Sequence, residues 1–215
     1  MKNLFSIAAL TTLIWGVLAG CATSQERAQP RVNAAAYYPL DVGNRWVFRA
    51  SSPAQPSENF EVRIDSKEPS GFYVSSQGMR MMRRAGGIFD GDRFLIEEPL
   101  EVGHSWMAVP SPSVVERFRI VGTRVPVSVP AGSFSDCLQV EMSQTIRGQN
   151  GSNGRLVGVW TYAKGVGPVH FKQWVEFPEA DDIPNVEFQL LEFEVSEQSS
   201  RLSPVGESGQ VSSLP

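Results

Sequence analysis

Cysteine and histidine are scarce in this chain of 215 residues, which contains two of each. A structural zinc site needs four Cys or His ligands close together, and two distant histidines without a cysteine cluster do not provide them. Basic side chains are also too few for a nucleic-acid interface, because 19 Lys and Arg stand against 23 Asp and Glu without forming a basic run. We therefore expect no metal ion, no other cofactor and no nucleic-acid partner.

Helical periodicity is also absent. Beyond residue 20, no long stretch repeats its apolar side chains at the spacing of a helix face. Strand patterns replace it. Phe60, Val62 and Ile64 alternate with charged residues, and the positions Leu156, Gly158, Trp160 and Tyr162 alternate with Val157, Val159 and Thr161. The sequence predicts an all-β fold of mostly antiparallel strands, many with one apolar and one solvated face.

The apolar run Leu4 to Leu18 is shorter than the about 20 residues that a transmembrane helix needs. It follows Lys2 and ends in small residues, which is typical of a secretory signal peptide over residues 1–20. The closing Leu18-Ala19-Gly20-Cys21 resembles the lipobox of bacterial lipoproteins. This resemblance implies that Cys21 is lipidated and that the lipid attaches the protein to a membrane. The alternative is a soluble protein released by cleavage.

Ala22 stands where an Asp would resemble an inner-membrane retention signal, so we expect a protein of the outer membrane that faces the periplasm. Loss of Lys2 with the signal leaves 18 basic and 23 acidic side chains, a net charge of −5. Composition then divides the chain into a flexible tether over 21–36, a β domain over 37–195 and a disordered tail over 196–215.

Cys137 is the one cysteine left beside a lipidated Cys21, so no intramolecular disulfide is expected. A lone thiol of this kind is more often a small buried hydrophobe than a redox centre. The stability of the domain must then come from a packed core.

An eight-residue motif occurs twice, as Pro39-Leu40-Asp41-Val42-Gly43-Asn44-Arg45-Trp46 and again, 60 residues later, as Pro99-Leu100-Glu101-Val102-Gly103-His104-Ser105-Trp106. Five of its eight positions are identical. We interpret it as a glycine turn that directs a Trp into the core, with Gly43, Trp46, Gly103 and Trp106 as structural anchors. The two positions before each Trp differ between the copies, so we do not expect the motif to need them.

Gly103-His104-Ser105 has the beginning of a lipase nucleophile elbow, but Met107 stands where that motif needs a second glycine. The first copy of the repeat has neither the His nor the Ser. We therefore expect no catalytic residues and no enzyme activity, with an unrecognised hydrolase as a remote alternative.

Local signals predict several features of the sheet. Asp90-Gly91 predicts a hairpin between Ile88–Phe89 and Phe94–Ile96. Val115 to Val129 predicts two strands or one bent strand. The phase slip between Leu190 and Leu191 predicts a β-bulge.

Three motifs together carry a family resemblance: residues 37–46, the corner at 129–138, and Tyr162-Ala163-Lys164-Gly165-Val166-Gly167-Pro168-Val169. In this order they resemble bacterial envelope proteins of the DUF3108-like (TapB-type) group. The resemblance implies one strongly curved antiparallel sheet, an open half-barrel or incomplete barrel with little helix, similar to the lipoprotein carriers LolA and LppX. It implies no catalytic residues.

A sheet with one apolar face and no long helix must cover that face in another way. Either the sheet fills itself with its large aromatic side chains, or it leaves a groove for a lipid-like ligand or a segment of an envelope protein. Our candidate groove residues are Met79, Met81, Trp160 and Phe171, with the two methionines at its rim; core filling is the alternative for the methionines. We expect a lipid-anchored, non-enzymatic protein that binds such a ligand or partner, or else an accessory subunit of an envelope assembly that docks a protein and has no pocket.

The anchor is testable by substitution. In the pathway that this signal resembles, a thioether forms at the cysteine sulfur before cleavage, so Cys21→Ser should accumulate as the unprocessed precursor. Cell fractionation with mass spectrometry checks this expectation. A variant that is still cleaved and still bound to the membrane would remove the lipoprotein assignment.

Overall fold

The computed structural model describes residues 33–148, 151–178 and 180–196. The signal peptide, Cys21 and the tail from residue 197 lie outside the described residues. The elements are the 3₁₀ turn η1 (Ala34–Ala36) and strands β1 (Arg45–Ser52), β2 (Gln55–Lys67), β3 (Tyr73–Ser75), β4 (Arg80–Arg84), β5 (Gly87–Phe89), β6 (Phe94–Glu97), β7 (Ser105–Ser111), β8 (Val114–Val129), β9 (Gly132–Arg147), β10 (Asn153–Ala163), β11 (Gly167–Glu176) and β12 (Ile183–Glu194).

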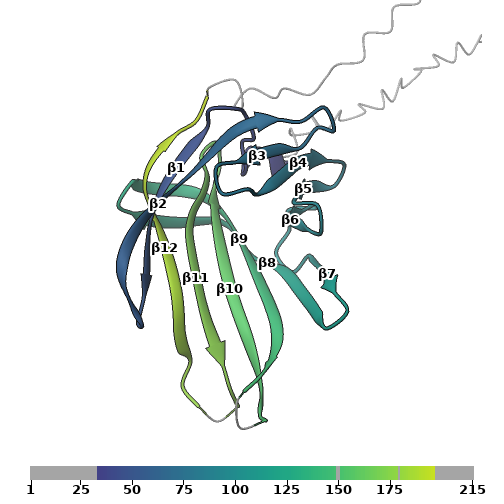
Figure 1. The fold of residues 1–215 in the computed structure, drawn as a ribbon, viewed down its shortest axis with the longest axis vertical. Coiled ribbons are helices and arrows are strands. Elements are labelled where there is room, and N and C mark those ends of the chain that lie inside the picture. Colours follow the sequence, from purple (N-terminus) through teal and green to yellow (C-terminus); the bar gives the residue numbers. More distant parts are fainter. Residues whose placement is uncertain (1–32, 149–150, 179, 197–215) are drawn as a thin grey trace, which may run out of the picture. The chain divides into compact units, whose positions relative to one another are not determined.

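All twelve strands belong to one antiparallel sheet in the order β6-β5-β4-β3-β2-β1-β12-β11-β10-β9-β8-β7. Neighbours in the sheet are neighbours in the chain, except where β1 pairs with β12. The sheet curls into a nearly closed barrel, with the long strands β8–β12 on one side and the short strands β3–β6 opposite (Figure 1). The predicted all-β class and curved antiparallel sheet are confirmed. Within the described ranges, no helix is long and apolar enough to cross a membrane.

The two edge strands of this sheet, β6 and β7, are joined by side chains where the ladder of backbone hydrogen bonds stops. The indole Nε1–H of Trp106 donates to the carbonyl oxygen of Phe94 at 2.9 Å. Arg93, just before β6, forms an ion pair with Glu116 on β8. The edges of a curled sheet would otherwise expose unpaired backbone groups, and these contacts bring them together.

Both copies of the repeat fold into the same hydrogen-bonded turn. The amide of Gly43 donates to the carbonyl of Ile64 at 2.8 Å, and the amide of Gly103 donates to that of Ile120 at 2.8 Å. Both glycines have positive φ, +96° and +95°, with open space where a Cβ would lie. Glycine is therefore required here by the backbone conformation and not by crowding from neighbouring atoms. Each turn attaches the chain just before one strand to the strand that follows it, near the end of β2 in the first copy and in the middle of β8 in the second.

The tryptophans that follow these turns are both buried, at 0% exposure for Trp46 and 8% for Trp106. The Nε1–H of Trp46 donates to the carbonyl of Val166 at 2.7 Å, so this ring contacts the β10–β11 turn. A Cβ on Gly167 would lie 3.1 Å from Trp46 Nε1, which shows how closely that turn packs on the ring. The same local motif thus fixes two different long-range contacts.

Asn44 corrects our expectation that the motif does not need the positions before each Trp. This residue is 1% exposed. Its Nδ2 donates to the carbonyl of Pro39 at 2.9 Å, and its Oδ1 accepts from the amide of Ser196 at 2.9 Å. A buried amide with both ends bonded stabilises the turn and fixes the chain after β12.

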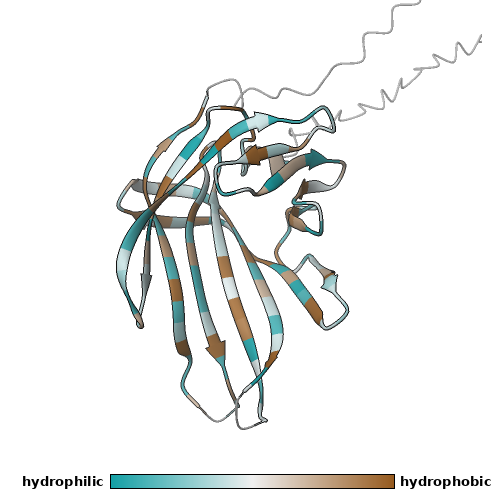
Figure 2. Cartoon of the chain, in the orientation of Figure 1, coloured by the Kyte–Doolittle hydropathy of each residue, from teal (hydrophilic) through white to brown (hydrophobic). Residues whose placement is uncertain are grey.

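Figure 2 shows the alternation of hydrophobic and hydrophilic residues along the long strands that predicted them. The hairpin around Asp90-Gly91 is confirmed as β5 and β6. The stretch Val114–Val129 is one bent strand, with register shifts around Gly122 and a positive φ of 57° at Arg124. The predicted bulge is also confirmed: Val47 pairs with Glu192 and Phe48 with Leu190, which leaves Leu191 as the extra residue.

The anchors make a stability prediction. Trp46→Ala and Trp106→Ala should each lower the free energy of unfolding by about 3 to 5 kcal/mol, because each removes a buried ring and a hydrogen bond. Urea unfolding measures the loss. Trp174→Ala is the matched control, since Trp174 is only half-buried on β11 and should cost less. If Trp174→Ala lowers the free energy of unfolding as much as either anchor variant, the tryptophans of the repeat are no more important for stability than any other tryptophan.

Candidate functional site

The curled sheet lines a half-open cavity of about 750 Å³. Such a volume lies within the range of about 300 to 1,000 Å³ that is typical of small-molecule sites. Its walls come from β1, β2, β10 and β12 on one side and from β4, β6 and the turns before them on the other.

Aromatic rings form the floor of the cavity. Phe48 stacks on Phe60 at 5.4 Å between ring centroids, and Phe60 meets Phe188 edge-on at 5.1 Å. Trp160 on β10 stacks on Phe171 of β11 at 4.3 Å. Phe48, Phe60, Trp160 and Phe188 border the cavity. Phe171 does not border it; this residue pairs with Trp160 across β10–β11 and with Phe188 across β11–β12, so its ring packs between theirs on the same face of the sheet. The floor therefore presents ring faces and edges to whatever occupies the cavity.

Gly158 provides the space for that stacking. A Cβ at this position would lie 2.9 Å from Cε2 and 3.1 Å from Cζ of Phe171. The absence of a side chain at Gly158 therefore lets the Phe171 ring stack against Trp160.

Two hairpin turns form the rim opposite the floor. The first, Gln77 to Met79, connects β3 to β4, and the second, Asp90 to Asp92, connects β5 to β6. In the second turn, Asp90 Oδ1 accepts from the amides of Asp92 and Arg93, and Asp90 Oδ2 accepts from Arg93 Nε at 3.1 Å. These bonds hold the turn in one conformation.

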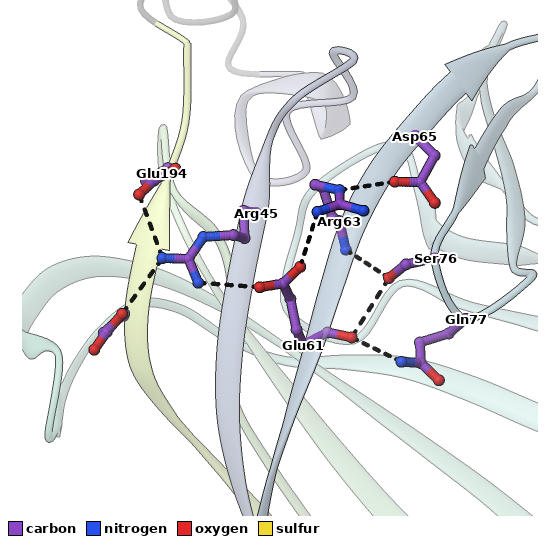
Figure 3. A network of polar contacts seen from close by, with 8 residues as sticks. Arg45, Glu61, Arg63, Asp65, Ser76, Gln77 and Glu194 are labelled. Atoms are coloured by element: carbon purple, nitrogen blue, oxygen red, sulfur yellow. Dashed lines mark hydrogen bonds and ion pairs between the residues drawn. The ribbon is translucent and has the colours of Figure 1, made fainter.

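Figure 3 shows how the first turn is held against β2. Gln77 Nε2 donates to the carbonyl of Glu61 at 2.8 Å, and Ser76 Oγ accepts from the amide of Arg63 at 3.0 Å. The Glu61 carboxylate in turn pairs with Arg45 at 3.1 Å. Arg45 also pairs with Glu192 and Glu194 on β12. These pairs lie at the surface and contribute little stability each, but they link β1 to β12 and to β2, the strand that holds the first rim turn.

Tyr38 and Tyr162 form an uncharged polar corner of the cavity. The two residues are 5% and 3% exposed, and their ring centroids lie 5.8 Å apart. Burial raises the pKa of both phenols, so both stay protonated at neutral pH. Among the residues that the structure describes, neither hydroxyl has a hydrogen-bond partner. Their neighbour Tyr37 differs, since its hydroxyl donates to Asp136 at 3.2 Å.

Charges at the cavity are balanced by pairing. Arg93 pairs with Asp90 and with Glu116, and Arg80 pairs with Glu68 at 2.6 Å. The four charged side chains that line the cavity are Asp90, Asp92, Arg80 and Arg93. Their formal charges cancel, and the two further carboxylates that pair with the arginines make the surroundings net negative.

The structure places three of the four candidate groove residues in the cavity lining, and packs the fourth against one of them. Trp160, Met79 and Met81 line the cavity, whereas Phe171 does not. Met79, 42% exposed, lies at the rim as expected. Met81 is 1% exposed and belongs to the inner wall, because it points inward from β4 while the turn before it carries Met79 outward.

The remaining candidates for chemistry lie apart from the cavity. Cys137 is fully buried, and burial raises the pKa of its thiol to about 11, so it is held as the neutral thiol. His170 Nε2 lies 2.7 Å from the Glu187 carboxylate, and that contact lowers the pKa of Glu187. His104 Nε2 lies 3.3 Å from the Glu97 carboxylate beside the β6–β7 edge. Within the described ranges, no three His, Cys, Asp or Glu side chains are grouped to hold a metal ion.

Sequence reasoning missed most of the cavity lining. Phe48, Phe60 and Phe188 lie on the apolar faces of predicted strands, so alternation identified their face but not their neighbours across the barrel. Tyr38 and Tyr162 are part of the family-like motifs. Nothing in their spacing indicated that their rings lie side by side.

No protein-family model and no curated protein matches the chain. Among solved structures, a candidate lipoprotein from Parabacteroides distasonis is 14% identical over 76% of this chain and 100% of its own, with a TM-score of 0.45. A candidate exported protein with a YMCC-like fold from Bacteroides fragilis is 15% identical over 74% of this chain and 98% of its own, with a TM-score of 0.44. At such similarity, the function of this chain has to be argued from its own residues.

The floor of the cavity makes a second stability prediction. Gly158→Ala should destabilise the fold by about 1 to 3 kcal/mol in urea unfolding, because the new methyl group displaces the Phe171 ring. In a Phe171→Leu background the same change should cost much less, since the smaller side chain leaves room. Equal costs in the two backgrounds would show that the Gly158–Phe171 contact is not the cause.

Proposed function

We propose that this protein is a lipid-anchored, non-enzymatic protein of the cell envelope that binds a hydrophobic small molecule inside its curved sheet. The observation that carries this proposal is the cavity of about 750 Å³ with its aromatic floor. Burying apolar ligand surface against these rings removes it from water, which is the main favourable term in such binding.

The signal peptide and Cys21 support the envelope location, and the residue after the cysteine supports the outer membrane, facing the periplasm. One acyl chain alone binds a membrane only marginally, whereas two or more give stable attachment. A protein held at the bilayer in this way has hydrophobic molecules within reach. This arrangement suits a binding protein for amphiphiles.

The lining of the cavity supports a binding role over catalysis. The described residues that border it include no Ser, Cys, His or Lys, so the usual nucleophiles of acyl transfer are not among them. Its arginines are engaged in ion pairs, and its tyrosines are protonated.

A second candidate function, docking of an envelope protein, is favoured by one observation. The edge strand β7 exposes Met107 and Val109, at 67% and 63%, on the outside of the sheet, and Val102 before it is 63% exposed. An exposed apolar edge strand is a common place for a partner to pair. The cavity supports ligand binding more strongly than β7 supports docking, because its aromatic lining includes two hydroxyls without a hydrogen-bond partner among the described residues.

Blocking the cavity tests the proposal. Met79→Trp with Leu95→Trp adds two rings to its lining and should weaken binding of the neutral fluorescent probe N-phenyl-1-naphthylamine by about 10-fold or more, in line with the loss of a hydrophobic contact. Fluorescence titration of residues 22–215 gives the affinity, and urea unfolding shows whether each variant is folded.

The matched control is Met107→Trp with Val109→Trp, which adds the same two rings to the exposed face of β7. It should leave probe binding within about 2-fold of the wild type, a change of no more than about 0.4 kcal/mol. Weaker binding in the control with unchanged binding in the cavity variant would move the apolar site to β7 and favour the docking function.

A further inference from the structure

We infer that the ligand of this cavity is an amphiphile with an uncharged head group, and that the hydroxyls of Tyr38 and Tyr162 bind this head by hydrogen bonds. The inference rests on the proposed function and adds the chemical class of the ligand.

The two hydroxyls lack hydrogen-bond partners in the described part of the chain. Both residues are more than nine-tenths buried and line the cavity, yet neither hydroxyl has a partner among the described residues. Among the described residues, the buried side-chain atoms without a hydrogen-bond partner are Arg83 Nε and His104 Nε2, so the two hydroxyls open into the cavity instead of being sealed in the core. They can bond water there, and a ligand oxygen that replaces this water keeps the hydrogen bond.

Tyr38 and Tyr162 border the cavity together with Asp90 and Arg93 of the β5–β6 turn, and both of these charged residues act electrostatically on Tyr162. The aromatic floor extends from there through Trp160, whose ring centroid lies 6.2 Å from that of Tyr162. A molecule in the cavity therefore meets hydrogen-bonding groups at one end and ring faces along its body, which is the pattern of an amphiphile.

The charges around the phenols exclude an anionic head. Arg93, which acts electrostatically on Tyr162, is already paired with two carboxylates, Asp90 and Glu116. A third carboxylate, Asp92, lies on the same turn. A carboxylate or phosphate head would enter a net negative region and would lose its hydration without gaining a free cation.

A cationic head is disfavoured too, because it would need a counter-charge beside the buried phenols. The carboxylate of Asp90 is held by Arg93 and by two backbone amides, and that of Asp92 is exposed to solvent. Neutral phenols do not supply that charge. An alcohol, ester or ketone needs none, and each phenol can donate a hydrogen bond to its oxygen.

Three probes with one alkyl chain and different heads test the inference: dodecanol, dodecanoate and dodecyltrimethylammonium, each displacing N-phenyl-1-naphthylamine from residues 22–215 at pH 8. Dodecanol should displace it at a concentration at least about 10-fold lower than either charged probe, because burial of an unpaired charge is costly. A charged probe that displaces as well as dodecanol overturns the inference.

Tyrosine variants test the roles of the two hydroxyls. Tyr38→Phe and Tyr162→Phe should each weaken dodecanol binding about 3- to 10-fold, the effect of one hydrogen bond, and leave naphthylamine binding unchanged. Without ligand, both variants should be about as stable as the wild type, since neither hydroxyl bonds another described group of the protein. Tyr37→Phe is the matched control: it should lose stability, because it breaks the bond to Asp136, and keep the wild-type preference for dodecanol.

The outcomes separate the two proposals. Failure of the wild type to bind any of the probes overturns the proposed function and this inference together. Binding of the naphthylamine with unchanged dodecanol affinity in both Tyr→Phe variants overturns this inference alone.

Discussion

A sheet with an apolar face has to cover that face, and in the described part of this chain no α-helix is present to do so. The exposed apolar area would otherwise remain in water at a cost of about 25 cal/mol per Å². The solution is curvature: twelve strands bend until the short strands β3–β6 face the long strands across a shared interior. Closure is incomplete where β6 meets β7, and there side chains of Trp106 and Arg93 replace the ladder. The cavity is the part of the interior that the side chains of the sheet do not fill.

The repeated motif serves this curvature at two places. Each copy uses a left-handed glycine to return the chain onto the next strand, and each copy then buries a Trp. The contacts beyond the turn differ. Trp46 is fixed against the β10–β11 turn and Trp106 against β6, so one anchor supports the middle of the sheet and the other joins its edges. A duplicated local structure thus has two distinct global roles.

The sequence predicted what local patterns determine. Alternation revealed the strands, Asp90-Gly91 the hairpin, and the phase slip the bulge at Leu191. It also identified Trp160 and Phe171 as residues of one face. A period of two residues specifies the face of a side chain but not its exposure to the cavity, so it did not show that Phe171, packed between Trp160 and Phe188, does not border the cavity.

Non-local contacts explain the remaining misses. The burial of Asn44 depends on Ser196, more than 150 residues later, and the pairing of Tyr38 with Tyr162 depends on the closed sheet. Likewise, Met81 was expected at the rim and lies in the wall, because the β3–β4 turn sets which methionine faces solvent.

The central claim is that the closed sheet holds a small uncharged amphiphile at the Tyr38–Tyr162 corner. Native mass spectrometry of the protein released from its own membrane, without added lipid, tests it most directly. The account predicts a one-to-one complex with a small molecule whose isolated mass spectrum shows no acidic or basic group. A folded protein that carries only its bare mass, or that carries a charged lipid, would contradict the account.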